Sequence, residues 1–579
     1  MQRLLFLLVM GSAGISLWAC TPAATVKVAG RPTEKPQPLL QPQLGESDFG
    51  QFVTHHVSEV APLEKQMNLA YWDASLTGKK EDYAQKSELE LVLKKAYADE
   101  DKYRTLQRWR GEGTVSDPQQ ARQLDLLFLA FQENQQDPAL LKQMIDLSTE
   151  VEEMFNTYRS QVDGQVLTDN DVMDILKVES RSSQRKKVWE AFQARGERVR
   201  PKILELVRLR NQAARKLGYA DYYEMQLRLM EQDPRQIQAL FEDLARQTDQ
   251  PFQRIMAPVN KKLAARFRIK PADLRPWHYE DPFFQEAPTV GQVDLDPLFR
   301  NRDAKAIVEG YFKGVGLNPA DILQHSDLYE KGGKMPHAYC IDIDRLGDVR
   351  ILANLRDNEK WVSTLLHEMG HALYDKYIDP RLPWLLREPA HSFTTEAVAM
   401  LFGRQTRNPG WLLRALDLPA NRVQAISDDV RFQQRLSMLV FARWGMVMQR
   451  FEQELYRNPD QNLDQLWWTL KERYQLQHAP EGRQAADWAA KIHIALWPAY
   501  YHNYLLGELM ASQLQHHIGF TILKAANWKD LALVDQPAIG EFLRDKILLP
   551  GKRLSWSKLL EQATFESLNP AYFAQQFVD

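Results

Sequence analysis

Cysteine is nearly absent from this chain, with only Cys20 and Cys340 among 579 residues. Cys20 lies at the end of an apolar leader and is a candidate for modification, which leaves Cys340 without a partner, so no disulfide is expected. A domain of this length buries enough apolar surface to fold without covalent cross-links. Ordinary side-chain packing therefore has to supply the stability of the fold.

The chain also lacks an excess of either charge. It has 73 Lys and Arg residues against 76 Asp and Glu residues, a formal net charge of -3, and the two signs are interspersed. This pattern argues against a nucleic acid as a partner. Beyond the leader, no apolar run is long enough to cross a bilayer. A nucleic-acid-binding protein and a membrane-spanning protein are therefore both disfavoured.

The first twenty residues have the pattern of a bacterial secretion signal. A basic start at Arg3 is followed by an apolar run over residues 4–10 and then by small residues that lead to Leu17-Trp18-Ala19-Cys20. The apolar run is too short to span a bilayer as a mature helix. Its end resembles a lipoprotein signal; an ordinary signal peptide that happens to end near a cysteine is the alternative. We predict a lipoprotein signal peptide over residues 1–19 and a lipid on Cys20.

The predicted lipid indicates where the protein resides. A chain anchored through Cys20 would belong to the cell envelope of a bacterium, and Thr21 after the cysteine, instead of Asp, resembles the outer-membrane default. We therefore expect a lipid anchor to the outer membrane, with the protein facing the periplasm. Residues 20–45 are rich in Pro and Gln and poor in apolar side chains, so they are predicted to form a disordered linker.

Residues 46–579 have the pattern of one large helical domain. Apolar residues recur at helical spacing, and helix starts are marked by an Asp followed by Pro, as at Asp137-Pro138 and Asp233-Pro234. No Pro/Gly-rich break and no internal repeat divides this segment. We predict a mainly α fold, built as a single unit of two lobes.

One stretch departs from the helical pattern. Residues 337–343 and 349–353 are predicted to be two short strands, with a turn at 344–347 between them. This predicted hairpin immediately precedes the segment that carries the strongest chemical motif. An exposed strand edge at this place could pair with an extended peptide.

The segment from Trp361 to Tyr374, WVSTLLHEMGHALY, is predicted to be a zinc-binding helix. His367 and His371 would lie one turn apart on the same face, close enough for both imidazoles to bind one Zn²⁺ at about 2.0 to 2.1 Å. Glu368 could take a proton from a zinc-bound water and later pass it to a leaving amine. Gly370 would leave room beside the metal. A chance occurrence of this spacing on an ordinary helix is the alternative.

A catalytic zinc site needs a third protein ligand and an open fourth position. Glu396 is the preferred candidate, because it is the one carboxylate of a predicted apolar helix and would be costly to bury without a partner such as zinc. Glu388 and His391 are the alternatives. Both lie closer to the loop that connects the two helices.

These motifs together resemble those of the angiotensin-converting enzyme family of zinc peptidyl-dipeptidases and, more distantly, of the thimet oligopeptidases. The pentapeptide HEMGH at 367–371 is identical to the family's zinc motif, and Glu396 falls where the family places its glutamate ligand. Residues 68–76 also resemble a family segment near the start of the domain. The resemblance implies a two-lobed helical peptidase of the HExxH-plus-Glu type, with a deep central cleft, a small active-site β-hairpin and one Zn²⁺ per chain.

The resemblance also assigns substrate-binding residues. His337 and Ala338 look like the family's His-Ala edge, along which a peptide substrate lies. Lys491-Ile492-His493-Ile494 looks like the family's Lys-x-His-Ile. It implies that Lys491 would hold the C-terminal carboxylate of the substrate and that His493 would hydrogen-bond the substrate or the tetrahedral intermediate.

Two family tyrosines three residues apart are matched by Tyr501 and Tyr504. By this resemblance Tyr501 would contact the substrate, and Tyr504 would donate its hydroxyl to the oxyanion. Such a donor is commonly worth about 100- to 1000-fold in rate. The spacing from His493 is slightly longer than in the family, so Tyr500 is a rival for the same role.

Two residues depart from the family pattern. Met400 stands where the family usually has an Asp that orients a zinc histidine, so the orientation of that histidine has to come from elsewhere. Asn503 stands where chloride-activated members have Arg, which puts chloride activation in doubt.

The sequence therefore predicts a zinc metallopeptidase that hydrolyses short peptides and releases C-terminal dipeptides. An endopeptidase of the oligopeptidase kind, an inactive zinc-binding envelope lipoprotein and a metallohydrolase acting on another bond are the alternatives. The presence of Glu368 argues against the inactive form, since zinc affinity alone needs no general base. No oligomeric state follows from the sequence, and a monomer is the default expectation.

Overall fold

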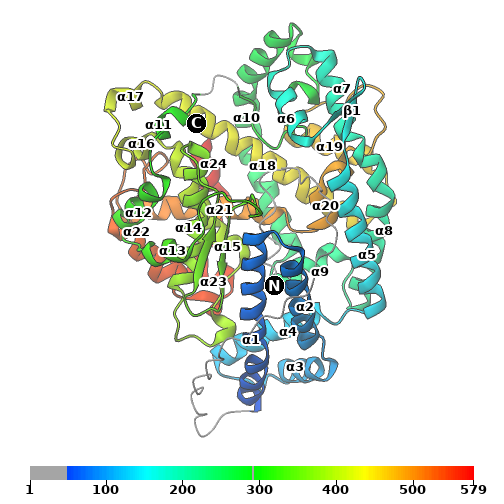
Figure 1. Ribbon diagram of the computed structural model, residues 1–579, viewed down its shortest axis with the longest axis vertical. Coiled ribbons are helices and arrows are strands. Elements are labelled where there is room, and N and C mark those ends of the chain that lie inside the picture. Colours follow the sequence, from blue (N-terminus) through cyan, green and yellow to red (C-terminus); the bar gives the residue numbers. More distant parts are fainter. Residues whose placement is uncertain (1–47, 290–292, 579) are drawn as a thin grey trace, which may run out of the picture.

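The computed structural model describes residues 48–289 and 293–578 of the chain (Figure 1). The predicted signal peptide, the lipid site at Cys20 and the linker over residues 20–45 lie outside the described residues and stay predictions. Within the described ranges, none of the helices combines the length and the apolar content that a bilayer crossing needs.

The fold is mainly helical, which confirms the predicted class. The helices of the first half are α1 (Asp48–Thr77), α2 (Lys80–Tyr97), α3 (Glu100–Glu112), α4 (Pro118–Glu133), α5 (Pro138–Thr157), α6 (Asp169–Val178), α7 (Ser182–Gln193), α8 (Arg195–Lys216), α9 (Tyr222–Leu229) and α10 (Pro234–Phe267). Those of the second half are α11 (Asp296–Phe299), α12 (Ala304–Gly314), α13 (Ala320–His325), α14 (Glu359–Tyr377), α15 (Ser392–Gly403), α16 (Pro409–Ala415), α17 (Ala420–Gln424), α18 (Ser427–Arg457), α19 (Leu463–Gln475), α20 (Ile492–Leu496), α21 (His502–His516), α22 (Pro537–Phe542), α23 (Trp556–Thr564) and α24 (Ala571–Phe577).

The helix starts predicted from Asp-Pro pairs are confirmed. In α5 the carboxylate of Asp137 accepts the backbone N–H groups of Ala139 and Leu140 at 2.9 and 3.2 Å. Asp233 caps α10 in the same way. Proline at the first helical position lacks the N–H that a helix start leaves unbonded, so the Asp-Pro pair both caps the helix and fixes where it begins.

The predicted hairpin is also confirmed. β3 (Tyr339–Asp342) and β4 (Val349–Leu352) pair antiparallel, with Tyr339 opposite Leu352. A second hairpin, β1 (Ser160–Val162) and β2 (Gln165–Leu167), was not predicted. It turns at Asp163-Gly164, where both residues have positive φ, and this dipeptide is the short signal that could have indicated it.

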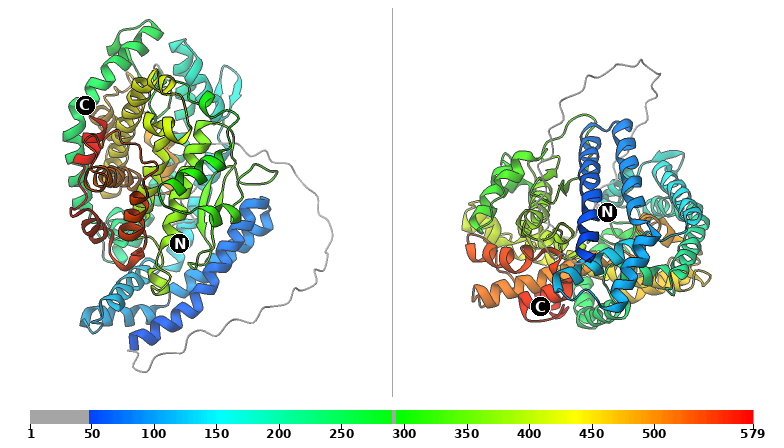
Figure 2. Two further views of the ribbon diagram at one scale, coloured as in Figure 1. Left: turned by 90° about the vertical axis from the view of Figure 1, so that its left-hand side faces the viewer. Right: turned by 90° about the horizontal axis from the view of Figure 1, so that it is seen from below.

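The second half of helix α1 is bound to the β3–β4 hairpin. The amide of Asn68 donates to two backbone carbonyls at the end of β3, at 3.1 and 3.2 Å, and Lys65 pairs with Asp344 at 3.0 Å. At the hairpin turn, Arg345 makes two bonds of 2.6 and 2.7 Å with the carboxylate of Glu64. Figure 2 shows α1 and its neighbour α2 as two long blue helices side by side.

Three helices, α14, α15 and α21, pack closely near the middle of the molecule (Figure 1). A Cβ atom on Gly370 of α14 would lie 2.6 Å from the Cα atom of Ala399 on α15. A Cβ atom on Gly507 of α21 would lie 3.1 Å from both the Cβ atom of Glu396 and the sulfur of Met400. The crossing therefore requires glycine at position 370, and at position 507 a larger residue would be tightly packed. Gly370 makes room for the backbone of α15, not for a metal as the sequence suggested.

Substituting Gly370 by Ala is expected to lower the free energy of unfolding by about 1 to 3 kcal/mol, because the atoms it meets are backbone atoms that cannot rotate away. The measurement is urea denaturation followed by circular dichroism. Gly310→Ala on α12 is the control, since its Cβ would meet no atom within 4 Å and should stabilise the helix by about 0.5 to 1 kcal/mol. Equal stability of Gly370→Ala and the parent would contradict the tight crossing.

Candidate active site

The motif helix α14 is fixed at its start and along one face. The side chain of Asn358 caps it by accepting the N–H of Trp361 at 2.9 Å. Leu365, Leu366 and Ala372 are fully buried and anchor the helix in the core. The opposite face carries the two histidines of the motif, because a separation of four residues is close to one helical turn.

His367, His371 and Glu396 converge from α14 and α15. The Nε2 atoms of His367 and His371 lie 3.3 Å apart. One carboxylate oxygen of Glu396 lies 3.6 Å from Nε2 of His367 and 3.8 Å from Nε2 of His371. A tetrahedral ion with bonds of about 2.0 to 2.1 Å holds its ligand atoms about 3.3 to 3.4 Å apart. The spacing and the donor types therefore fit Zn²⁺. In the described part of the chain, this is the one group of three or more potential ligands that meets at a point.

The two alternative ligands are occupied elsewhere. Glu388 pairs with Arg345 at 3.1 Å and with Lys552 of the short helical turn Gly551–Arg553. The ring of His391 accepts the N–H of Phe393 at 3.0 Å and so caps α15. Glu396 is the candidate that the fold brings to the two histidines.

Glu368 is a buried carboxyl group between the metal group and the hairpin. It is 6% exposed, and one of its carboxylate oxygens has no hydrogen-bond partner among residues 48–289 and 293–578. Burial and the neighbouring Glu396 carboxylate raise the pKa of Glu368 to about 8, against a backbone N–H at Cys340 that lowers it. A cation between the ligands would lower this pKa again. Glu368 is thus placed to exchange a proton with a group held in front of it.

Lys491 is buried, although a lysine at this position could have been an ordinary solvated one. It is 6% exposed and donates to the amide oxygen of Gln285. Its ammonium group lies 5.5 Å from the centre of the Trp444 ring and 5.7 Å from that of Tyr501. Burial lowers the pKa of Lys491 to about 8, while the nearby carboxylate of Asp281 opposes the change. A buried cation of this kind is suited to bind an anion.

Gln285 was not predicted from the sequence. It lies in the irregular segment between α10 and α11, where no periodic pattern marks it. The carboxylate of Asp281 accepts the N–H groups of both Phe283 and Gln285 at 2.9 Å, and Lys471 donates to the carbonyl of Phe283. Phe284 has a positive φ of 54°. Several bonds thus hold this segment in a strained shape that presents Gln285 to Lys491.

His493 is buried with both ring nitrogens unbonded within the described part of the chain. Its ring packs on Trp497 and Tyr501, with centroids 5.3 and 5.2 Å apart. Burial, followed by the charge of Lys491, lowers its pKa well below the usual value, so the ring is neutral. A neutral imidazole with unsatisfied nitrogens can hydrogen-bond a bound ligand.

The three tyrosines after His493 occupy different places. The ring of Tyr501 contacts His493 and faces Lys491. Tyr500 and Tyr504 both lie near Glu396, whose carboxylate adds to the effect of burial in raising their pKa values. Tyr504 also contacts Tyr501, with centroids 5.4 Å apart. Tyr504 thus lies between Glu396 of the metal-ligand group and the side chains of Tyr501 and Lys491. This position favours Tyr504 over Tyr500 as the oxyanion donor.

Ala338 and His337 directly precede β3. Cys340, the second residue of that strand, presents its backbone N–H to Glu368. Backbone groups two residues apart in an extended chain point to the same edge. Ala338 therefore continues the edge that faces Glu368, and its peptide-binding role stays a prediction.

Asn503 belongs to a neutral network. Its amide oxygen accepts from Gln232 at 2.6 Å, and the other end of Gln232 bonds the ring of His502 at 2.7 Å. Burial and the nearby His391 lower the pKa of His502 to about 3, so none of the three side chains is charged. No cation of this network is available to hold a chloride ion beside Tyr504.

A model of the family described as "Angiotensin-converting enzyme" matches residues 44–571 of the chain. The chain belongs to the angiotensin-converting enzyme family. Among curated proteins, the chain is similar to the "Inactive angiotensin-converting enzyme-related protein" of Caenorhabditis elegans, with 22% identity over 438 residues. The match covers 68% of this chain and 47% of that relative, so the chain spans about half the length of the curated relative.

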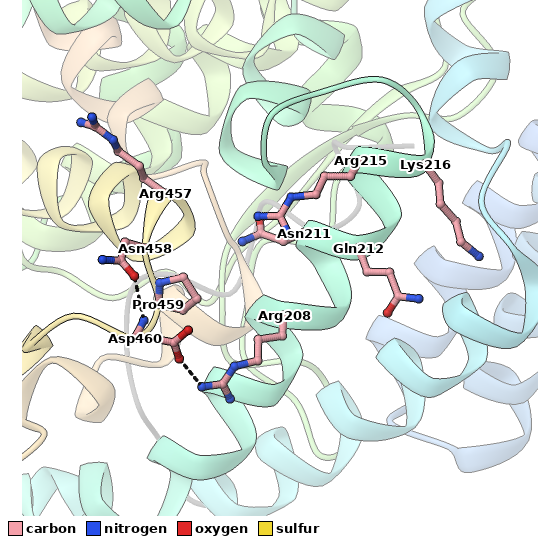
Figure 3. A pocket seen from close by; sticks show the side chains of 9 residues that line it. All are labelled: Arg208, Asn211, Gln212, Arg215, Lys216, Arg457, Asn458, Pro459 and Asp460. Carbon is pink, nitrogen blue, oxygen red and sulfur yellow. Dashed lines mark hydrogen bonds and ion pairs between the residues drawn. The ribbon is translucent and has the colours of Figure 1, made fainter.

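An open cavity of about 810 Å³ lies between the end of α8 and the segment at the end of α18 (Figure 3). It is lined by Arg208, Asn211, Gln212, Arg215, Lys216, Arg457, Asn458, Pro459 and Asp460. Arg208 pairs with Asp460 at 2.7 Å, and Lys216 pairs with Asp137 at 2.8 Å. Because its cations are largely matched by carboxylates and none of the predicted site residues lines it, this cavity is no part of the candidate active site.

Substituting Glu396 by Gln is expected to weaken zinc binding by more than about 100-fold, since loss of outer partners of a metal ligand already costs about 10- to 100-fold. Zinc affinity is measured by competition with a chromogenic chelator. Glu388→Gln is the matched control and should bind zinc like the parent while losing its pairs with Arg345 and Lys552. The opposite ranking of the two variants would reassign the third ligand.

Proposed function

We propose that this protein is a zinc-dependent peptidyl-dipeptidase that releases dipeptides from the C-terminus of short peptides. The observation that carries the proposal is the position of Glu368, which adjoins a zinc-type ligand group on one side and a peptide-binding strand edge on the other. Membership of the angiotensin-converting enzyme family supports the reaction class. The cell-envelope location and the lipid on Cys20 complete the proposal and rest on the sequence pattern.

The proposed reaction divides its tasks among the metal group, Glu368 and Tyr504. Zn²⁺, when held by His367, His371 and Glu396, would polarise the scissile carbonyl and lower the pKa of a water molecule. Glu368 takes a proton from the attacking water and passes it to the leaving amine. The hydroxyl of Tyr504 donates a hydrogen bond to the carbonyl oxygen as negative charge develops on it.

Substrate binding is proposed to involve the β3 edge at Ala338 and the buried cation Lys491. The peptide backbone extends the β3 edge at Ala338 and adds main-chain hydrogen bonds there. Lys491 and Gln285 receive the terminal carboxylate, with Tyr501 beside them, and His493 bonds the peptide between that end and the scissile bond. The buried position of Lys491 supports an anion as its partner, because burial of an unpaired ammonium group is otherwise costly.

Two other functions compete with this proposal. An endopeptidase would use the same metal group and Glu368 without the carboxylate contact at Lys491. An inactive zinc-binding protein is the second alternative, and the curated relative from Caenorhabditis elegans carries the word inactive in its name. The retained Glu368 and the empty hydrogen-bonding capacity of His493 favour an active enzyme.

Glu368→Gln is expected to bind zinc normally and to lose at least about 100-fold in kcat, because the glutamine cannot exchange the proton. The full chain, purified in detergent and loaded with zinc, is incubated with an N-terminally blocked short peptide, and mass spectrometry identifies the products. Chelator should abolish release of C-terminal dipeptides by the parent. Absence of hydrolysis by the zinc-loaded parent would favour the inactive binding protein, and full hydrolysis by Glu368→Gln would overturn the assigned base.

A free C-terminal carboxylate is expected to raise kcat/KM by about 10- to 100-fold over the amidated peptide, the usual strength of a charged hydrogen bond. This preference should fall as the pH rises through about 8, since the lowered pKa of Lys491 means that the free enzyme loses the ammonium charge there. The measurement is kcat/KM for both peptides between pH 6 and 10.

Lys491→Met serves as the comparison for this pH profile. It should cleave the two peptides equally well and show no decline that is specific to the free carboxylate. If the parent already cleaves both peptides equally, the endopeptidase alternative replaces the dipeptidase.

A further inference from the structure

The zinc ligand His371 has an orienting partner that differs from the family pattern. Members of the family usually place an Asp one turn after the glutamate ligand for this purpose, and here that position is Met400. The sulfur of Met400 instead packs close to Gly507 of α21. A thioether is at most a weak acceptor, so it is a poor substitute for a carboxylate as a partner of an imidazole N–H.

Thr395 supplies an oxygen at the right place. Its hydroxyl oxygen lies 2.8 Å from Nδ1 of His371, while Nε2 of the same ring faces His367 and Glu396. With Nε2 acting as the metal ligand, Nδ1 carries the ring proton and donates it to the threonine oxygen. The hydrogen bond thus fits the tautomer that presents an Nε2 lone pair to the metal, and it fixes the orientation of the ring.

The surroundings of Thr395 hold this oxygen in place. The residue is buried on α15, and a β-branched side chain in a helix has few accessible rotamers. The crossing of α14 and α15 at Gly370 and Ala399 sets the distance between the two helices. Because the crossing lies one residue from His371, small changes in the separation would move the threonine oxygen and the ring nitrogen apart.

We propose that Thr395 is the positioning residue of His371, and that a neutral hydroxyl here takes the role usually given to a carboxylate. The inference rests on the proposed zinc site and assigns the origin of its geometry. A neutral partner adds no negative charge, so the ligand set of two imidazoles and one carboxylate leaves a bound Zn²⁺ with a net charge of +1. Thr395 acts through His371 and does not contact the reacting atoms.

The neighbouring Thr394 provides a matched control. It is equally buried on the same helix, but its hydroxyl donates to the carbonyl of His391 at 2.7 Å and accepts the N–H of that residue at 3.1 Å. Its bonds serve the helix cap and not the metal group. Removing either hydroxyl costs one buried hydrogen-bonding group, so the two substitutions differ chiefly in what they do to His371.

The test compares Thr395→Val, Thr395→Ser and Thr394→Val in the full chain. Zinc affinity is measured by chelator competition, and stability of the metal-free protein by thermal unfolding. Thr395→Val should weaken zinc binding about 10- to 100-fold, as loss of an outer partner does elsewhere, whereas Thr395→Ser should stay within about threefold of the parent. Thr394→Val should lower the melting temperature and leave zinc affinity unchanged.

Two results would overturn the inference. One is a Thr395→Val protein that binds zinc as tightly as the parent. The other is a Thr395→Ser protein that loses as much affinity as Thr395→Val, because the methyl group and not the hydroxyl would then be responsible. Neither measurement uses a peptide, so a parent that binds zinc but hydrolyses nothing would defeat the proposed function and leave this inference to be decided by the variants.

Discussion

The close crossing of α14 and α15 is the constraint on which the candidate site depends. The metal group takes two ligands from one helix and the third from the other, so the helix separation decides whether three atoms can share an ion. Side chains at the contact would push the helices apart, and the crossing is therefore made by Gly370 against the backbone at Ala399. On the far side, Gly507 lets α21 approach Glu396 and brings Tyr504 of that helix to the site.

Burial is the second common cause of the site's properties. Burial disfavours the charged forms of three groups in the site. It raises the pKa values of Glu368 and Glu396 and lowers the pKa of Lys491. Such groups are costly to the fold by themselves. The proposed divalent cation and the anionic end of a peptide would supply the missing charges. The charges of the site are therefore poorly balanced without ligands and would be better balanced with a cation and a peptide bound. This difference in electrostatic energy favours tight binding of the cation and of the peptide.

The sequence predicted the helical class, the β3–β4 hairpin and the grouping of His367, His371 and Glu396, because each depends on local spacing or on a lone carboxylate in an apolar helix. Gln285 could not be predicted, because its position depends on bonds made by two other residues. Lys471 is distant in the chain, and Asp281 belongs to the same irregular segment as Gln285. The partner of His371 was equally hidden, because a Thr beside a ligand has no distinctive pattern.

The spacing of the tyrosines after His493 had a similar limit. Between α20 and α21, Ala499 adopts a positive φ of 54°, and its N–H bonds the buried carboxylate of Glu452 at 2.9 Å. This turn shifts the rings relative to a count of residues along a regular helix. The ring contact with Tyr501 distinguishes Tyr504 from Tyr500, whereas spacing along the chain does not and both tyrosines lie near Glu396.

The bonds between α1 and the hairpin have a consequence for how the specificity of such an enzyme could change. Lys65 and Asp344 are 279 residues apart in the sequence, yet they join the first described helix to the turn of the strand pair that is proposed to carry the peptide. Substitutions on α1 would tilt or loosen that strand pair without altering any residue that touches a substrate. Adaptation to new peptides could therefore accumulate in a helix that comparison of motif residues alone would overlook.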